Sequence, residues 1–251
     1  NMPCDVFQAN IRINSPNLIV RDTIFGGNHA YRAVKQTYID IPVPVRMKTG
    51  GEFVNVYAGG NGAETITGQT HFKLYNNGQV LDVYGGGKNG QVTKNYDGAL
   101  ASNVNVTSYY AKHSHPIWTL DTSDPNINNT FVELLGGELR NVYGGGYAGN
   151  VTGKTYLKIG AITDASPTHA NGIPTIQRSA YGGCEMAEVT DTAKVDMFNG
   201  YVGYYYNSTN GRYIKNLDFR KEGDKLLKEN GNLYGAGYGE GAVVMSSKVN
   251  L

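Results

Sequence analysis

The sequence predicts an all-β protein built as a right-handed parallel β-helix, a three-faced β-solenoid of about six coils with three loop insertions. Three observations lead to this prediction. One short phrase recurs along the chain, each recurrence comes with three short strand-like segments, and glycine and tyrosine are unusually abundant. Glycine occurs 34 times and tyrosine 19 times in 251 residues, whereas charged residues make up 17%. Such a composition departs from that of an average globular domain and calls for a structural cause.

The recurring phrase is Asn-Val-Tyr-Gly-Gly-Gly or a close variant of it. Its copies are centred on the aromatic residues Phe25, Tyr57, Tyr84, Tyr143, Tyr181 and Tyr234. A glycine pair and an apolar residue precede several copies, and Val-Thr-Gly with Thr-x-apolar-x-apolar follows them. The shortest spacing, from Tyr57 to Tyr84, is 27 residues. A repeat of this length is typical of a solenoid, in which each unit stacks on the next.

Each repeat contains three short segments with strand character, separated by glycine or asparagine. The segment 72–74 alternates apolar and polar residues, and the repeats lack the three- and four-residue steps of a helix. Three strands per repeat make one coil of a three-faced β-helix. A right-handed coil is expected because parallel crossover connections strongly prefer that hand. The glycines are expected at the corners, where a tight turn needs a positive φ.

Two columns of side chains are expected to run along the coils. The residue two before each aromatic residue is small and hydrogen-bonding, and it is expected to satisfy backbone groups that the turn leaves open. The aromatic residues are expected to stack at the strand spacing of about 4.8 Å. The first column includes Asn55, Asp82, Asn141 and Asn232, and the second includes Tyr57, Tyr84, Tyr143, Tyr181 and Tyr234.

Residues 1–251 are expected to form a single β-solenoid segment of a longer protein, because neither end shows a capping segment. Three insertions interrupt the period, at about 94–129, 161–178 and 203–231. They are expected to leave the solenoid as loops. The stretch 224–229 in the third insertion is expected to form a short helix.

Charge and cysteine content argue against several classes of function. Lysine and arginine number 22 and aspartate and glutamate 21, so a formal charge of +1 gives no basis for binding nucleic acid. No apolar segment reaches the roughly 20 residues that a membrane-spanning helix needs. Cys4 and Cys184 are too few and too far apart for a disulfide framework or a metal cluster.

The phrase Val-Tyr-Gly-Gly-Gly, followed by Val-Thr-Gly and Thr-x-Leu-x-Ile, resembles a repeat in large surface-exposed and secreted proteins of anaerobic gut bacteria, especially Bacteroidota. Those proteins look like adhesins built on a β-helix. The resemblance implies a location at the bacterial cell surface or outside the cell, and it brings no catalytic motif. It also implies O-glycosylation at Thr23 and Thr192, which stand in Asp-Thr-Ile and Asp-Thr-Ala triplets.

The sequence favours a non-catalytic structural and adhesive role, in which a rigid solenoid presents loops to a glycan or to a host or matrix protein. Exposed aromatic rings can stack on sugars or anchor a protein partner. Four aromatic residues in or beside insertions are therefore ligand-contact candidates: Trp118, Tyr204, Tyr205 and Tyr206.

No cofactor is expected, although one stretch leaves calcium open as an alternative. Asp124, Asn126 and Asn128 have the alternate-residue spacing of calcium-binding loops. The glycine at the sixth position is missing, and Leu135 stands where a glutamate would complete such a loop.

Two other functions stay open. A polysaccharide lyase or glycoside hydrolase on a β-helix would need carboxylates and a basic residue gathered in one groove. The repeating strands offer acidic residues singly, as at Glu52, Asp82 and Glu138. A self-assembling fibre subunit would follow if the solenoid ends associate with each other.

Overall fold

The structure is a computed structural model that describes residues 6–48, 51–93, 129–161, 173–217, 220–222, 225–227 and 231–251. These residues form strands and turns, with no helix among them, and most of their strand pairs are parallel. The expected all-β class is therefore confirmed. None of the described segments is a helix long and apolar enough to cross a membrane.

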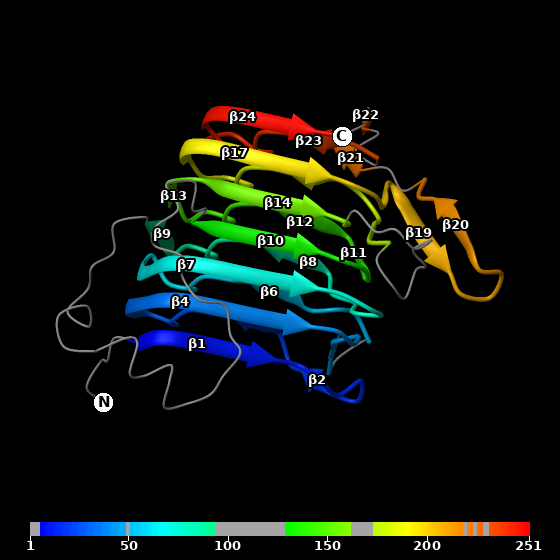
Figure 1. Ribbon diagram of the computed structural model, residues 1–251, viewed down its shortest axis with the longest axis horizontal. Coiled ribbons are helices and arrows are strands. Elements are labelled where there is room, and N and C mark those ends of the chain that lie inside the picture. The colour runs from blue at the N-terminus through cyan, green and yellow to red at the C-terminus, as the bar shows by residue number, and fades with distance from the viewer. Residues whose placement is uncertain are drawn as a thin grey trace.

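Strands from successive repeats stack in chain order in one nine-stranded sheet, whose colours in Figure 1 pass from blue at β1 to red at β24. All neighbouring pairs in this sheet are parallel. Because neighbouring strands are parallel, the chain must cross back after each strand to the end of the sheet where that strand began. The strands are β1 (Val6–Arg12), β4 (Tyr31–Ile41), β7 (Glu64–Leu74), β9 (Gln91–Thr93), β10 (Thr130–Leu134), β13 (Val151–Thr152), β14 (Thr155–Ile159), β17 (Val189–Met197) and β24 (Val244–Asn250).

The phrase around each tyrosine forms a second parallel sheet with six strands. It contains β3 (Thr23–Phe25), β6 (Asn55–Tyr57), β8 (Asp82–Tyr84), β12 (Asn141–Tyr143), β16 (Ala180–Tyr181) and β23 (Leu233–Tyr234). The middle residues of β6, β8 and β12 are fully buried valines, whereas the tyrosines and the residues two before them lie on the opposite face. The repeat phrase therefore places the aromatic and the hydrogen-bonding column on one side of this sheet.

A third, less regular set of parallel strands completes each repeat. It contains β2 (Ile19–Val20) paired with β5 (Arg46–Met47), and the three-stranded sheet of β11 (Glu138–Leu139), β15 (Thr175–Ile176) and β18 (Tyr201–Val202). Gln79 bridges the two sets by pairing with Pro44 and with Glu138. Each repeat thus contributes to all three strand sets.

The apolar core lies between the three strand sets. Register pairs Ile39 with Phe72, Phe72 with Val132, Val132 with Leu157 and Leu157 with Val195, and all five side chains are fully buried. A repeat cannot bury such a row alone, so stacking of repeats is what builds the core.

Buried threonines connect the nine-stranded sheet to the corner that follows each tyrosine. The Oγ1 atoms of Thr37, Thr130 and Thr155 donate to the carbonyl oxygens of Ala58, Gly144 and Gly182, each at 2.6 Å. Thr70 donates in the same way to Gly85. A buried carbonyl without a donor is costly, so these bonds explain why a threonine recurs at the start of an apolar strand.

The glycines after the tyrosines permit close backbone approach, and the expectation that they supply a positive φ is wrong. Gly85, Gly144 and Gly182 are not among the described glycines with positive φ. A Cβ atom on Gly144 would instead lie 2.2 Å from the carbonyl oxygen of Gly182 in the next repeat. Positive φ occurs at another corner, at Gly51 (72°) and Gly137 (79°).

The third insertion contains two antiparallel hairpins. In the first, β19 (Tyr204–Asn207) pairs with β20 (Arg212–Lys215) and projects from the side of the stack in Figure 1. In the second, β21 (Arg220–Glu222) pairs with β22 (Lys225–Leu227), so the helix expected at 224–229 is wrong. A six-residue stretch is too short to offset the cost of helix nucleation, whereas strand pairing satisfies its backbone at once.

The other two insertions differ less from expectation. Strand β15 lies inside the expected range 161–178 and pairs with β11, so the regular part of the repeat resumes earlier than predicted. Strands β9 and β10 both pair with β7, which shows that residues 94–128 are inserted where β7 runs without a break. Residues 94–128 and 162–172 themselves lie outside the described residues.

Charged side chains of alternating sign stand in register on the outer face of the nine-stranded sheet. They are Arg12, Asp40, Lys73, Glu133, Lys158 and Asp196. Lys158 Nζ lies 2.9 Å from Glu133 Oε1, and His71 Nε2 lies 3.5 Å from Glu133 Oε2. Burial alone would raise the pKa of Glu133, but the hydrogen bonds and charges of His71 and Lys158 lower it to about 2. Opposite charges on neighbouring strands therefore favour the observed register.

Replacing Thr155 with Val is expected to lower the free energy of unfolding by about 1–3 kcal/mol, because the buried carbonyl of Gly182 loses a donor. Thr155→Ser keeps the hydroxyl group and is expected to lose clearly less. Urea unfolding followed by circular dichroism measures both variants. Equal losses would contradict the role assigned to the hydroxyl.

Because the pKa of Glu133 is lower in the folded chain than its ordinary value of 4.5, its contacts stabilise the fold above that pH. Glu133→Gln is expected to be less stable than the parent by up to about 3 kcal/mol at about pH 7. The difference should shrink as the pH falls through 4.5 towards 2, since the parent then takes up the proton as well. Denaturant unfolding across this range tests it, and a pH-independent difference would count against the ion pairs.

A candidate binding groove beside the tyrosine column

The outer face of the six-stranded sheet carries a column of stacked aromatic rings. The ring centroids of Tyr57 and Tyr84 are 4.5 Å apart, and those of Tyr84 and Tyr143 and of Tyr143 and Tyr181 are 4.8 Å apart, with planes within 7°. Phe25 and Tyr234 extend the column at 5.2 and 4.9 Å. Each ring covers the face of the next, so the four inner tyrosines are 4–5% exposed and Tyr234 at the end is 43% exposed. A ligand can therefore reach the edges of these inner rings but not their faces.

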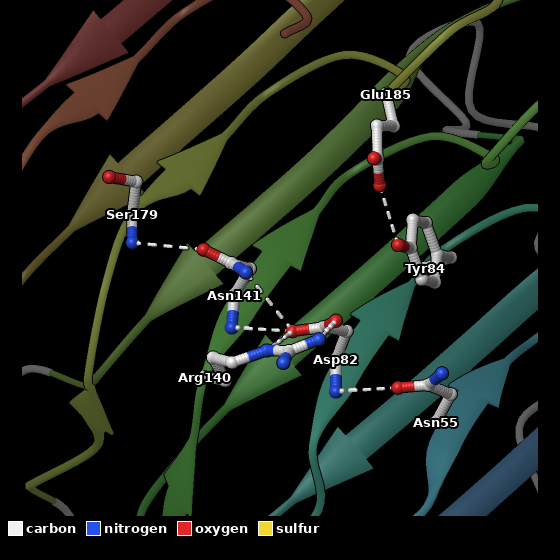
Figure 2. A network of polar contacts seen from close by, with 7 residues as sticks. All are labelled: Asn55, Asp82, Tyr84, Arg140, Asn141, Ser179 and Glu185. Carbon is white, nitrogen blue, oxygen red and sulfur yellow. Dashed lines mark hydrogen bonds and ion pairs between the residues drawn. The ribbon is translucent and has the colours of Figure 1, made fainter. Parts of the chain in front are cut away.

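The hydrogen-bonding column runs beside the rings and links one repeat to the next. Asn55 Oδ1 accepts the backbone N–H of Asp82 at 3.3 Å, and Asp82 Oδ1 accepts that of Asn141 at 3.1 Å. Asn141 Oδ1 in turn accepts the N–H of Ser179 at 3.3 Å, as Figure 2 shows. For Asn232 the described contact is its backbone carbonyl, which accepts the N–H of Ala180 at 3.0 Å, and its side-chain role stays a prediction. These side chains hold neighbouring repeats together at the corner, as the sequence suggests.

A groove of about 500 Å³ lies over the two columns. Its size falls within the range of pockets that hold small molecules or short oligomers. Six side chains outside the columns also line it: Lys88, Tyr147, Glu185, Tyr238, Arg140 and Arg178.

One wall of the groove is a row of residues that each stand four positions after a column tyrosine. The row consists of Lys88, Tyr147, Glu185 and Tyr238. The backbone carbonyl of each of the first three accepts, at 2.7–2.8 Å, the N–H of the residue that follows the next member of the row. Tyr147 meets the ring of Tyr84 edge-on, with centroids 5.9 Å apart. Tyr238 approaches Tyr181 in the same manner at 5.4 Å.

Arginines that immediately precede a member of the hydrogen-bonding column form the other wall. Arg140 comes before Asn141 and Arg178 before Ser179, and the N–H of Arg178 donates to the carbonyl of Arg140 at 2.9 Å. The two arginines therefore occupy equivalent places in neighbouring repeats.

Both carboxylates that line the groove are held by donors within the protein. Arg140 binds Asp82 through two nitrogens, with Nε 2.9 Å from Oδ1, and Asn141 Nδ2 donates to the same oxygen at 3.1 Å. The hydroxyl of Tyr84 donates to Glu185 Oε2 at 2.5 Å (Figure 2). Bidentate arginine–carboxylate pairs fix the geometry of both partners.

The tyrosine hydroxyls in the groove are neutral hydrogen-bond donors. Burial raises the pKa of Tyr57, Tyr84 and Tyr143 above the ordinary value of 10, and the negative charge of Glu185 raises it further. A phenol of raised pKa keeps its proton at neutral pH. The Tyr84 hydroxyl gives its proton to Glu185, and none of these three phenols can act as a base at neutral pH.

The groove was not predicted from the sequence, which did not single out Lys88, Arg140, Arg178 or Glu185. A signal was present, because each stands at a fixed offset from the tyrosine of its repeat. Stacking of the repeats in register brings these offsets together along one face. The groove also contains two carboxylates and basic residues, the feature that the enzyme alternative requires.

The tyrosines expected to contact a ligand are not in the groove. Tyr204, Tyr205 and Tyr206 lie on β19, where Tyr204 packs edge-on against Tyr201 and Tyr206 packs against Tyr213. Tyr205 is 37% exposed. The other expected contact, Trp118, and the calcium candidates Asp124, Asn126 and Asn128 lie outside the described residues.

The remaining sequence candidates stand apart from the groove. The Thr23 and Thr192 hydroxyls donate to the preceding aspartates, Asp22 and Asp191, at 3.1 and 3.0 Å. Cys184 is fully buried, and burial raises its pKa to about 12; Cys4 lies outside the described residues. Within the described segments, no group of three or more His, Cys, Asp or Glu side chains is arranged to hold a metal ion.

Tyr143→Phe is expected to make the fold less sensitive to alkaline pH. The folded chain retains the Tyr143 proton, whereas the unfolded chain releases it above about pH 10. Stability is thus full below that pH and falls as the pH rises. The variant should reduce this fall by up to about 1.4 kcal/mol per pH unit. Urea unfolding at several alkaline pH values measures the slope, and an unchanged slope would contradict the assignment.

Searches of the chain against protein-family models, curated proteins and solved structures each gave no match. The inference of function therefore starts from the groove and the repeat that builds it.

Proposed function

We propose that the chain is a segment of a right-handed parallel β-helix in a bacterial cell-surface or secreted protein, and that it binds an extended glycan without cleaving it. The β-helix is supported by three sets of parallel strands, to each of which every full repeat contributes in chain order. The resemblance of the Tyr-Gly-Gly-Gly repeat to bacterial surface proteins supports the location.

The groove beside the tyrosine column is the observation that carries the binding role. It extends over several repeats and is lined by donors and acceptors in rows, including phenol, amide and guanidinium groups. Sugar hydroxyls need donors and acceptors alike, and these side chains supply both. The stacked rings and the hydrogen-bonded column already hold the groove in place, so little ordering is needed when a ligand binds.

A binding role without catalysis agrees with the electrostatics of the groove. Asp82 is neutralised by Arg140, and Glu185 accepts the Tyr84 hydroxyl. General acid–base catalysis needs a group that can reach the substrate and titrates near the working pH. The buried phenols have a pKa raised well above that range.

The proposal is tested on a glycan array with two variants that differ in location. Tyr147→Asn replaces a residue of the groove wall with asparagine, which is the residue at the equivalent position, Asn61, of another repeat. A triple alanine variant of Tyr204, Tyr205 and Tyr206 alters the β19 hairpin instead. We expect Tyr147→Asn to weaken binding by about tenfold or more and the hairpin variant to bind like the parent. The reverse result would move the site to the hairpin. No binding by the intact chain would overturn the glycan-binding role.

A polysaccharide-active enzyme is the second candidate, because Asp82, Glu185 and Arg178 share one groove. Incubating each bound glycan with the chain and measuring its length and its new chain ends separates the two. Unchanged glycan is expected. Shortened glycan would show that the chain cleaves its ligand and would overturn the non-catalytic role.

A self-assembling fibre subunit is favoured by a different observation. Apolar side chains at the β24 end of the stack are well exposed, with Val243 at 59%, Met245 at 77% and Leu251 at 91%. Size-exclusion chromatography of the array sample separates binding by single chains from binding by polymers.

A further inference from the structure

Two cations in the groove form no ion pair with an acidic side chain among the described residues. Five charged side chains line it, three of them cations and two of them carboxylates. Asp82 is paired with Arg140, and Glu185 is bound by the Tyr84 hydroxyl. In the described part of the chain, no ion pair joins Lys88 or Arg178 to a carboxylate.

The repeat accounts for the difference between Arg140 and Arg178 within the described residues. Arg140 reaches back to Asp82, the hydrogen-bonding column residue of the preceding repeat. Arg178 occupies the equivalent place one repeat later, where the corresponding column residue is Asn141. The repeat position that gives Arg140 a carboxylate partner therefore holds a neutral amide in the case of Arg178.

We propose that the groove selects an acidic glycan, and that Arg178 and Lys88 bind its anionic groups. This inference rests on the proposed glycan-binding function and names its ligand class. A guanidinium group offers paired donors that match a carboxylate or a sulfate, and a lysine ammonium adds a second point charge.

The positions of the two cations favour a polymer over a single small anion. Lys88 belongs to the repeat of Tyr84 and Arg178 to that of Tyr181, so one repeat lies between them. Two steps along the stack amount to about 10 Å. The cations also come from opposite walls. A chain bearing acidic groups at intervals can meet both, whereas one carboxylate cannot.

The test compares three polymers of different charge on the intact chain by isothermal titration calorimetry. Polygalacturonate supplies carboxylates, heparin supplies sulfates and dextran is neutral. We expect at least one acidic polymer to bind about tenfold more tightly than dextran, and added salt to weaken that binding. The stronger of the two acidic polymers identifies which anion the groove prefers.

Variants taken from the repeat itself separate charge from folding. Arg178→Leu introduces the residue type found at the equivalent Leu81, and Lys88→Asn that of Asn61. Each is expected to weaken acidic-polymer binding by about tenfold, to change dextran binding far less, and to leave the melting temperature unchanged. Arg212→Gln and Lys215→Ala, on the exposed β20 hairpin outside the groove, serve as matched controls and should bind like the parent.

The possible failures are distinguishable. If dextran binds as tightly as the acidic polymers and Tyr147→Asn abolishes that binding, the glycan site stands but its acidic selectivity is overturned. If the matched controls lose as much affinity as Arg178→Leu, the attraction is a property of the whole surface and the assigned cations are wrong. If no polymer or arrayed glycan binds, both the ligand class and the proposed function fail.

Discussion

The backbones of successive repeats approach closely after each column tyrosine, where Gly85, Gly144 and Gly182 stand and Ala58 is the largest residue. A Cβ atom on Gly85 or Gly144 would lie 2.1 or 2.2 Å from a carbonyl oxygen of the adjoining repeat. This approach brings the tyrosine rings to stacking distance and sets the corner carbonyls within reach of the buried threonines. The aromatic column, the threonine bonds and the register of the core therefore meet at one corner, which holds glycine or, at Ala58, a single methyl group. A bulky side chain at this corner of one repeat would disturb two sheets at once.

Two polar systems, one on the six-stranded and one on the nine-stranded sheet, hold the repeats in register. On the six-stranded sheet, Asn55, Asp82 and Asn141 each accept a backbone N–H of the next repeat. On the nine-stranded sheet, charges of alternating sign face each other across neighbouring strands, as Lys158 faces Glu133. Register in a sheet is most strongly specified where such pairs exist. The groove inherits its shape from this backbone order, because its walls are repeat positions and not loops.

The repeat phrase was enough to predict the all-β class, the parallel stacking and both columns, because each follows from a period that is visible in the printed sequence. The glycine prediction failed at Gly144, since a sequence does not distinguish a glycine that needs a positive φ from one that needs space. The helix at 224–229 failed because local composition carried no information on strand pairing. The groove was not predicted because Arg140 and Asp82 are 58 positions apart in the sequence, with a long insertion between them. Their contact becomes visible only when the repeats are aligned through the insertion.

The aromatic column has the same geometry whether or not an insertion separates two of its members. Tyr57 and Tyr84 follow each other without an insertion and stack at 4.5 Å, while Tyr84 and Tyr143 flank residues 94–128 and stack at 4.8 Å. The stacking of the repeats thus does not depend on whether a segment is inserted between them. Mutation and recombination can rewrite or lengthen an inserted segment at little cost to folding, and duplication of a unit can extend the groove. Such a molecule can diversify what it presents while its framework is inherited unchanged.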